Sequence, residues 1–434
     1  MAWPNEIMDQ TNPVLVIGGG PAGLVAAGQA AAAGVATILL ERTDHLGAKL
    51  RITGHGRCNL TNLAPSDLFL EHFASPDGTD NGSHLFLRNA LARFFAPELC
   101  AWLESLGVGT VADKEGRVFP ASHDARHVAE ALAGFARRQG VQIWLRSRAT
   151  GLDIGSGRMQ GLALEDGRRL PAGAVIVASG GASYPHTGST GDGYRLAEQA
   201  GHRLAPIRPA LVPLVLAGDE PKAMMGLSLR GVEARLLLDE REMARASGDL
   251  LFTHYGVSGP LALTLSRAAV AWLGHGRLEL AVNLRPGLAA DELDLRLLAE
   301  MARYSRRTYC NLLRALLPDR MSDMVAARTG IAATKPVHQI TAAERARLRA
   351  LLQELRFEVT GHRPLAEAMV TAGGVDTGEI EPATMASRLV AGLYFAGEVL
   401  DVQADTGGFN LQAAFSTGYV AGQAAACYVK TLNL

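Results

Sequence analysis

The sequence predicts an α/β fold in which helices cover a parallel β-sheet. Three observations near the start of the chain predict it. Val14–Ile17 is a short apolar run, mostly β-branched, and is typical of a buried parallel strand. Three glycines follow it, and residues 24–33 are then a run of small helix-forming residues. Residues 36–40 form a second apolar run, which completes a strand–helix–strand unit.

The glycines between the first strand and the helix match the pattern G-x-G-x-x-G. Gly18 permits a tight turn, Gly20 lets the main chain approach a pyrophosphate, and Gly23 lets the helix pack close to the strand. Pro21 and Ala22 open the helix, whose free N–H groups favour phosphate. The unit therefore predicts a dinucleotide site, against the alternative of a glycine-rich turn that binds nothing.

Glu41 ends the second strand, 23 residues after Gly18. An acid at this position can accept hydrogen bonds from the hydroxyls of the adenosine ribose, and it disfavours a 2′-phosphate. NADP is therefore not expected at this site. The motif by itself does not separate FAD from NAD.

Composition excludes several other classes of protein. The chain has 434 residues, is 48% hydrophobic and has a formal net charge of -1, so it is neither a uniformly basic nucleic-acid binder nor an acidic tail. The four cysteines form no C-x-x-C pair, which predicts no metal site, no disulfide framework and a reducing cytoplasm. We find neither a signal-peptide pattern nor 18 consecutive apolar residues, so we expect a cytoplasmic protein without a membrane span.

Four blocks further along the chain share motifs with one family of flavoproteins. Residues 47–62 are GAKLRITGHGRCNLTN, residues 176–195 are IVASGGASYPHTGSTGDGYR and residues 251–260 are LFTHYGVSGP; the region 369–418 contains MVTAGGV, GLYFAGEVLDV and TGGFNLQAAFSTG. In this order they resemble the YhiN/BaiN-like family of NAD(P)- and FAD-dependent oxidoreductases. Ala48, His55 and residues 403–405 depart from the family pattern.

This resemblance implies FAD as the cofactor and a glutathione-reductase-type FAD-binding Rossmann domain with an inserted β-barrel and helical domain. We place the FAD domain at residues 1–208 and 362–434, the β-barrel at 209–290 and a basic helical subdomain at 291–361. The residues agree with such a division. Residues 234–238 and 278–283 are β-like runs, whereas 291–356 has a helical period and is rich in Leu, Ala and Arg.

Matching positions and chemistry together predict the flavin site. Lys49, Arg57 and Asn59 lie in the loop after Glu41, near the pyrophosphate and ribityl chain, and Ala149 meets the adenine through its main chain. Glu398 can hold ribityl or ribose hydroxyls. The last helix begins near Gly408 and directs its N–H groups at the N1/C2=O edge of the flavin. The predicted cofactor-binding residues are Gly18, Gly20, Pro21, Ala22, Gly23, Glu41, Arg42, Lys49, Gly56, Arg57, Cys58, Asn59, Ala149, Gly180, Gly181, Gly397, Glu398, Gly407, Gly408, Phe409, Asn410 and Leu411.

The electron donor and the proton donor remain open at this point. No second G-x-G-x-x-G is present, so NAD(P)H is expected to bind transiently over the flavin. Cys58, Tyr184, His186 and His254 are the candidate catalytic residues, because thiol, phenol and imidazole groups can all transfer a proton. For each of them, a purely structural role is the alternative.

Members of this family reduce uracil to dihydrouridine in ribosomal RNA, oxidise small amines or reduce a steroid enone. Residues 303–356 contain 11 Lys/Arg and 4 Asp/Glu, a local net charge of +7, and Arg303, Arg306 and Arg307 are expected to share one helix face. A basic helical face can bind an RNA backbone, although it is equally typical of a solvated helix. The predicted RNA-binding residues are Arg303, Arg306, Arg307, Arg345 and Arg349.

The sequence hypothesis is therefore an FAD-dependent reductase of a uracil in ribosomal RNA, with NAD(P)H as the donor. The alternative is a flavin-dependent oxidase or reductase of a small amine, ketone or enone. A third possibility, a module that holds flavin without catalysis, agrees least with so complete a flavin site.

Overall fold

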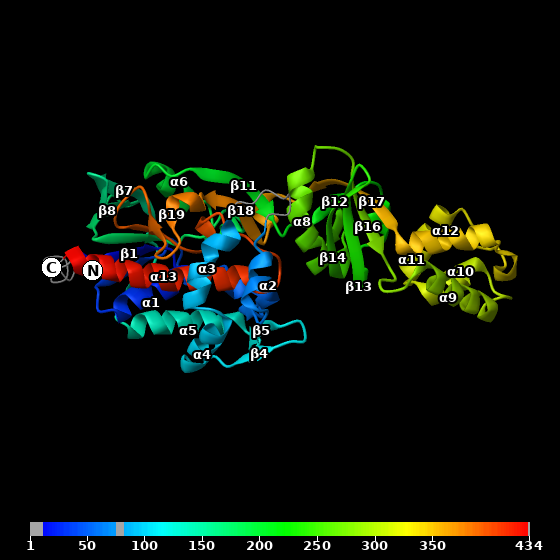
Figure 1. Cartoon of the computed structure of the whole chain (residues 1–434), viewed down its shortest axis with the longest axis horizontal. Coiled ribbons are helices and arrows are strands. Elements are labelled where there is room, and N and C mark those ends of the chain that lie inside the picture. The colour runs from blue at the N-terminus through cyan, green and yellow to red at the C-terminus, as the bar shows by residue number, and fades with distance from the viewer. Residues whose placement is uncertain (1–11, 75–81, 433–434) are drawn as a thin grey trace. The chain divides into compact units, whose positions relative to one another are not determined.

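The computed structural model describes residues 12–74 and 82–432 and divides the chain into two compact units (Figure 1). Unit 1 comprises Met1–Ala210 and Leu365–Leu434, and unit 2 comprises Leu211–Pro364. The chain thus leaves unit 1 after Ala210 and returns to it at Leu365.

The centre of unit 1 is a seven-stranded sheet with the order β19-β20-β21-β10-β1-β2-β6. Neighbouring strands from β6 to β21 run parallel, and β20 and β19 continue the sheet in antiparallel pairs. The residues of β1, β2, β10 and β21 are all buried, which explains their continuous apolar runs. The strands are β1 Val14–Ile17, β2 Thr37–Leu40, β6 Gln142–Trp144, β10 Ala174–Val177, β19 Ile380–Glu381, β20 Ala386–Ser387 and β21 Leu393–Phe395.

Helices α1 (Pro21–Ala32) and α13 (Phe409–Leu432) pack directly against each other beside this sheet. The backbones approach so closely that a Cβ on Gly418 would lie 2.4 Å from the carbonyl oxygen of Ala22, and one on Gly422 would lie 2.3 Å from that of Ala26. No side chain fits there. This packing brings the N-terminal ends of two helices, far apart in the sequence, to one end of the sheet.

Smaller elements complete unit 1. Two three-stranded sheets and one pair of strands accompany the main sheet. Their strands are β3 Thr61–Asn62, β4 Thr110–Ala112, β5 Arg117–Pro120, β7 Ala149–Gly155, β8 Arg158–Leu164, β9 Arg169–Pro171, β11 Leu204–Ala210 and β18 Val370–Val375. The remaining helices are α2 Ser66–Glu71, α3 Ser83–Arg93, α4 Ala96–Ser105, α5 Ala125–Arg138 and α6 Asp192–Gln199.

Unit 2 contains a closed barrel with the strand order β12-β15-β14-β13-β16-β17. Its strands are β12 Leu214–Leu216, β13 Ser228–Leu238, β14 Arg241–Phe252, β15 Gly256–Ser258, β16 Leu278–Asn283 and β17 Leu355–His362. Its helices are α7 Glu220–Ala223, α8 Pro260–Trp272, α9 Ala290–Arg303, α10 Tyr309–Leu316, α11 Asp319–Thr329 and α12 Ala342–Gln353. The barrel and the helices α9 to α12 share one continuous apolar core.

Two sequence predictions for unit 2 need correction. The strand β17 begins inside the range 291–361, which was predicted to be helical, and it closes the barrel between β12 and β16. Helix α9 ends at Arg303, so Arg306 and Arg307 lie in the turn that precedes α10 and do not share a helix face with it. The helical period of residues 291–356 predicted a helix through these arginines, but a turn follows Arg303.

None of the helices within residues 12–74 and 82–432 is long and apolar enough to cross a membrane. In the same residues, no group of three or more His, Cys, Asp or Glu side chains is arranged to hold a metal ion.

Candidate functional site

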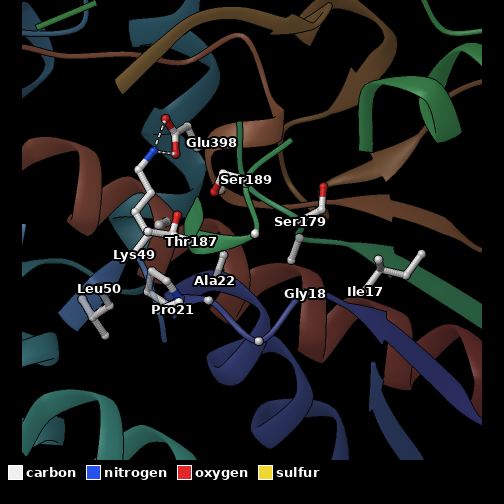
Figure 2. Close-up of a pocket in the computed structure, with 18 of the residues that line it drawn as sticks. Ile17, Gly18, Pro21, Ala22, Lys49, Leu50, Ser179, Thr187, Ser189 and Glu398 are labelled. Atoms are coloured by element: carbon white, nitrogen blue, oxygen red, sulfur yellow. Dashed lines mark hydrogen bonds and ion pairs between the residues drawn. The ribbon is translucent and has the colours of Figure 1, made fainter. Parts of the chain in front are cut away.

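Unit 1 contains a pocket at the carboxyl ends of its parallel strands (Figure 2). Ligands of open α/β sheets bind at this edge. Eleven short segments contribute to its wall: Ile17–Ala22, Leu40–Arg42, Ala48–Leu50 with Thr53, Ser147–Ala149, Ala178–Gly180, Thr187–Ser189, Asp192, Met369–Val370, Ala396–Glu398, Val402, and Asn410 to Ala414 without Gln412.

The glycine loop after β1 forms one wall of this pocket. Gly18, Gly20 and Gly23 each have a different structural reason to be glycine. Gly18 has φ +107°, and a Cβ there would lie 2.5 Å from the carbonyl oxygen of Ala178. A Cβ on Gly23 would lie 1.9 Å from the carbonyl oxygen of Gly18, so this glycine is required for packing. Gly20 is the N-cap of α1. A Cβ added there would have no atom within 4 Å, because the pocket opens beside it.

Glu41 holds the glycine loop in place. Its Oε2 accepts the main-chain N–H of Gly19 at 2.7 Å, and its Oε1 accepts the main-chain N–H of Thr43 at 2.7 Å. The side chain is almost fully buried and lines the pocket. A carboxylate offers about four lone pairs, so Glu41 retains acceptor capacity for the hydroxyls of a ribose.

Lys49 and Glu398 form an ion pair across the pocket. The Nζ of Lys49 lies 2.9 and 2.8 Å from the two carboxylate oxygens of Glu398 and donates to Ser183 Oγ at 2.7 Å (Figure 2). Glu398 also accepts the main-chain N–H of Thr371 at 2.8 Å. Only about a fifth of each charged side chain is exposed, at 20% and 21%. The pair therefore places a fixed polar group in a pocket with mostly apolar and backbone walls.

A second ionic group lines the pocket around Asp192. Arg148 binds this carboxylate with two bonds of 2.8 and 2.9 Å, Arg42 binds it at 3.0 Å, and Arg195 binds it as well. Burial of Asp192 alone would raise its pKa, but the hydrogen bonds from Arg148 and the surrounding guanidinium charges lower it. Asp192 therefore stays ionised and holds Arg42 and Arg148 in the wall.

The start of α13 forms another part of the wall. Gly407 and Gly408 have φ values of +138° and +99°, and a Cβ on Gly408 would lie 2.4 Å from the carbonyl oxygen of Thr61. Asn410 fixes this turn, because its side chain bonds both the N–H and the carbonyl oxygen of Ala404, at 2.9 and 3.0 Å. Asn410, Leu411, Ala413 and Ala414 then line the pocket with the N-terminal turns of α13.

These features fit a flavin dinucleotide. Two helix N-termini and an open glycine suit a pyrophosphate and a reduced flavin ring, and Glu41 and Glu398 suit hydroxyl groups. Ser179 adds an independent sign, because its Oγ is buried in the pocket wall and, within the described residues, has no hydrogen-bond partner. A buried hydroxyl of this kind costs free energy unless a ligand completes it.

The structure places the predicted cofactor residues in two groups. Thirteen line the pocket: Gly18, Gly20, Pro21, Ala22, Glu41, Arg42, Lys49, Ala149, Gly180, Gly397, Glu398, Asn410 and Leu411. The other nine lie outside its lining: Gly23, Gly56, Arg57, Cys58, Asn59, Gly181, Gly407, Gly408 and Phe409. Several of these support the wall from behind, as Gly23 and Gly408 do through close backbone contacts.

Arg57 and Asn59 are directed to the protein itself. The Arg57 guanidinium is exposed and lies 5.2 Å from the centre of the Phe119 ring. The Asn59 amide can donate to the carbonyl oxygens of Val118 and Thr61 and accept the N–H of Gly408 at 3.1 Å. Asn59 thus ties its loop to the start of α13, in contrast to the predicted contact with the cofactor.

Cys58 packs in the core of unit 1, contrary to the prediction that it donates a proton. Its side chain is fully buried, and burial raises the pKa of the thiol to about 12. A structural role was the alternative for Cys58, and the burial of its side chain agrees with it.

Of the other catalytic candidates, His186 lies in a short 3-10 helix, Pro185–Thr187, which follows Tyr184, and His254 lies in a loop. Tyr184 and His186 contact each other edge to face, with ring centres 5.5 Å apart, directly before the pocket residues Thr187 to Ser189. His254 belongs to unit 2, is exposed and contacts Tyr255 at 4.8 Å. The structure therefore brings Tyr184 and His186 close to the pocket segment, and none of the three is in the pocket lining.

Sequence reasoning missed several lining residues, among them Ser147, Arg148, Ser179 and Asp192. Asp192 and Ser189 lie in the block GSTGDGYR, whose density of Gly and polar residues was the available signal. Ser147 and Arg148 had none, because only the pairing of β6 with β2 brings them to the sheet edge.

Comparisons with known proteins agree with this geometry. The family model of the HI0933-like protein Rossmann domain matches residues 12–424. A 3-dehydro-bile acid Δ(4,6)-reductase from Clostridium scindens is 34% identical over 96% of this chain and 99% of its own. Ribosomal RNA dihydrouridine synthases from Escherichia coli and Haemophilus influenzae are 29% and 30% identical, over 94% and 95% of this chain and 96% and 98% of theirs.

Solved structures with the same fold are more distant in sequence. A flavocytochrome c3 fumarate reductase has a TM-score of 0.52 at 16% identity and covers 97% of this chain and 79% of its own. A 3-ketosteroid Δ1-dehydrogenase from Sterolibacterium denitrificans has a TM-score of 0.51 at 13% identity, over 96% of this chain and 100% of its own. The chain therefore belongs to the HI0933-like family of flavin-dependent oxidoreductases, the family that its sequence motifs resemble.

Proposed function

We propose that this protein binds FAD in the pocket of unit 1 and reduces a carbon–carbon double bond conjugated to a carbonyl group in a small molecule. FAD binding is supported by one observation: two helix N-termini, the open Gly20 and the Glu41 carboxylate all face the same pocket. The observation that supports the substrate is the 34% identity to a bile acid reductase over nearly the full length of both chains.

The roles of the chain's own residues follow from their positions. Bound FAD supplies the hydride chemistry, and the protein supplies orientation and charge. The first turn of α1 offers N–H groups to the pyrophosphate, and Glu41 offers oxygens to the ribose. The first turn of α13 stabilises negative charge where it develops on a reduced ring. Lys49 and Glu398 fix polar groups in the pocket wall.

The balance of the proposed reaction requires one hydride and one proton. The carbon β to the carbonyl receives the hydride, and the carbon α to it receives the proton, so that the product gains two hydrogens. Tyr184 and His186 are the candidate proton donors of unit 1, since they directly precede the pocket segment Thr187 to Ser189. NAD(P)H is the proposed donor that regenerates the reduced cofactor.

The charges of unit 2 favour a small molecule over RNA. Most of the basic side chains counted between residues 303 and 356 already have partners. Arg345 binds Asp294 with two bonds of 2.9 and 3.1 Å, Arg356 binds Glu240 at 2.7 Å, and Lys335 binds Glu344 at 2.7 Å. A polyanion would have to compete with these carboxylates, whereas a small neutral ketone would not.

Reduction of a uracil in ribosomal RNA is the second candidate. The two synthases with 29% and 30% identity support it, and the ring double bond of uracil is likewise conjugated to a carbonyl. Arg303, Arg306 and Arg307 are exposed, and the Arg303 guanidinium lies 5.7 Å from the centre of the Tyr304 ring. These features leave a small basic surface for a nucleic acid.

A single-turnover experiment separates the two candidates. The flavin-loaded protein is reduced without oxygen and mixed with a steroid enone, with its saturated analogue, or with ribosomal RNA that lacks dihydrouridine. We expect the enone to restore the absorption of oxidised flavin and to gain two hydrogens by mass spectrometry, while the saturated analogue does neither. Reoxidation by the RNA, with dihydrouridine as the product, would overturn the small-molecule assignment. Parallel reduction with NADH and NADPH identifies the donor.

A further inference from the structure

Unit 2 contains a second pocket, separate from the flavin pocket of unit 1. It lies among α9, the end of α10, the loop after β16 and Leu352 of α12, all within the helical region that Figure 1 shows beside the barrel strands. Its volume is about 420 Å³. Cavities of roughly 300–1,000 Å³ are typical of small-molecule sites.

The floor of this pocket is apolar and well anchored. One main-chain and one side-chain hydrogen bond hold it together: the Leu284 N–H donates to the carbonyl oxygen of Leu352 at 2.9 Å, and the side-chain amide of Gln353 donates to that of Leu288 at 3.3 Å. The side chains that form the floor are Leu288, Leu293, Leu297, Leu316 and Leu352. This surface is suited to the flat apolar body of a ligand.

Three arginines, Arg285, Arg296 and Arg303, line the same pocket, with one acid, Glu300. Arg296 pairs with Glu292 at 2.8 Å, outside the pocket lining, and Arg303 lies 3.8 Å from Glu300. The exposed fractions of 63% and 73% for Arg296 and Arg303 leave both guanidinium groups free to turn toward a ligand.

Arg285 provides the strongest evidence for an anion site in this pocket. Its side chain is half-buried, and its guanidinium donates to the carbonyl oxygens of Leu284 and Leu316. The main-chain N–H of Arg285 donates to Asn283 Oδ1 at 2.9 Å. Among the described residues, no carboxylate pairs with it. Carbonyl oxygens orient a guanidinium but do not neutralise it, so a fixed positive charge borders the leucine floor of the pocket.

We infer that this pocket is a binding site for a small amphipathic anion, in which an apolar ring system lies on the leucine floor and a carboxylate or sulfonate meets Arg285 and Arg303. This site is separate from the site of the proposed reaction, because its lining residues and those of the flavin pocket belong to different units. An RNA backbone would use the arginines but not the apolar floor.

Calorimetric titration of the flavin-loaded protein with anilinonaphthalene sulfonate, an apolar aromatic anion, tests this site. Ala299 lines the mouth of the pocket from the exposed side of α9, so Ala299→Trp fills the mouth without entering the core. We expect Ala299→Trp to abolish binding, and Arg303→Gln to weaken it about tenfold, as loss of one charge-assisted hydrogen bond predicts. Arg285→Gln should weaken binding further.

Arg306→Gln is the matched control, because Arg306 is exposed in the adjoining turn but does not line the pocket. It should bind the probe as the wild type does, and all variants should retain their flavin. A neutral naphthylamine analogue should bind much more weakly than the sulfonate. The proposal is overturned if Ala299→Trp and Arg303→Gln both bind as the wild type does, or if the neutral analogue binds equally well.

Discussion

The ammonium group of Lys49 lies 2.8 Å from a carboxylate oxygen of Glu398, although the two residues are 349 positions apart in the sequence. The contact joins the loop after β2 to the turn after β21 across the proposed flavin pocket. Both halves of unit 1, which the insertion of unit 2 separates in the sequence, thus contribute one charge each to a single ion pair.

We expect this pair to stabilise the fold as a unit, because only about a fifth of each charged side chain is exposed. Lys49→Met should lower the free energy of unfolding by about 1–3 kcal/mol, since it leaves the Glu398 carboxylate without its cation. The double variant Lys49→Met, Glu398→Gln should cost less than the two single changes added together. Urea unfolding of the four flavin-free proteins measures this coupling, and strictly additive costs would contradict it.

Gly20 and Gly23 provide a test that separates cofactor binding from folding. A Cβ on Gly20 meets no atom within 4 Å, whereas one on Gly23 lies 1.9 Å from a carbonyl oxygen. Gly20→Ala should therefore keep the melting temperature of the flavin-free protein but weaken FAD binding about tenfold or more, because the methyl group occupies the space for the pyrophosphate. Gly23→Ala should lower the melting temperature itself. A Gly20→Ala variant with wild-type FAD affinity would place the pyrophosphate elsewhere.

Local patterns were enough to predict the first strand–helix–strand unit, because the glycines, Glu41 and the apolar runs act within 30 residues of one another. Residues 234–238 and 278–283 were also identified correctly as strand segments, in β13 and β16. The strand β17 was not predicted, because it directly follows a helical region. Its pairing with β12 and β16 is seen only in the closed barrel.

The site shows the same division between local and distant information. Lys49 and Glu398 line the pocket, as their motifs predicted. Their contact with each other could not be predicted, because it depends on the return of the chain to unit 1. Asn59 and Cys58 belong to the same motif as Lys49, and its composition does not reveal that one bonds to main chain and the other is buried. The charge of Arg345 looked available for RNA because Asp294, its partner, lies 51 residues earlier on α9.

Gly422 should be essential for the contact between α1 and α13. A Cβ there would lie 2.3 Å from a carbonyl oxygen of α1, which is backbone and cannot rotate away. Gly422→Val should therefore destabilise the protein by about 3 kcal/mol or more, because the two helices must separate. Cys427→Ala, at an exposed position of the same helix, is the control and should change stability little. Thermal unfolding measures both, and equal melting temperatures would contradict the close packing.

Cys58 should affect the dependence of stability on pH and not the reaction. Burial raises its pKa from 9.0 to about 12, so between these values the unfolded chain loses a proton that the folded protein keeps. Folding stability should consequently fall as the pH rises from 9 to 12, and Cys58→Ala should remove part of that fall. Chemical unfolding at several pH values measures the difference between the two proteins.

The same thiol gives a second readout under native conditions. Iodoacetamide should modify the exposed Cys427 quickly and leave Cys58 unmodified, because the reagent attacks an accessible thiolate. Peptide mass spectrometry distinguishes the two sites. If Cys58 only packs in the core, Cys58→Ala should retain the rate at which reduced flavin is reoxidised by the substrate. A loss of that rate with unchanged flavin content would instead return Cys58 to the reacting site, and the buried conformation would then have to open during turnover.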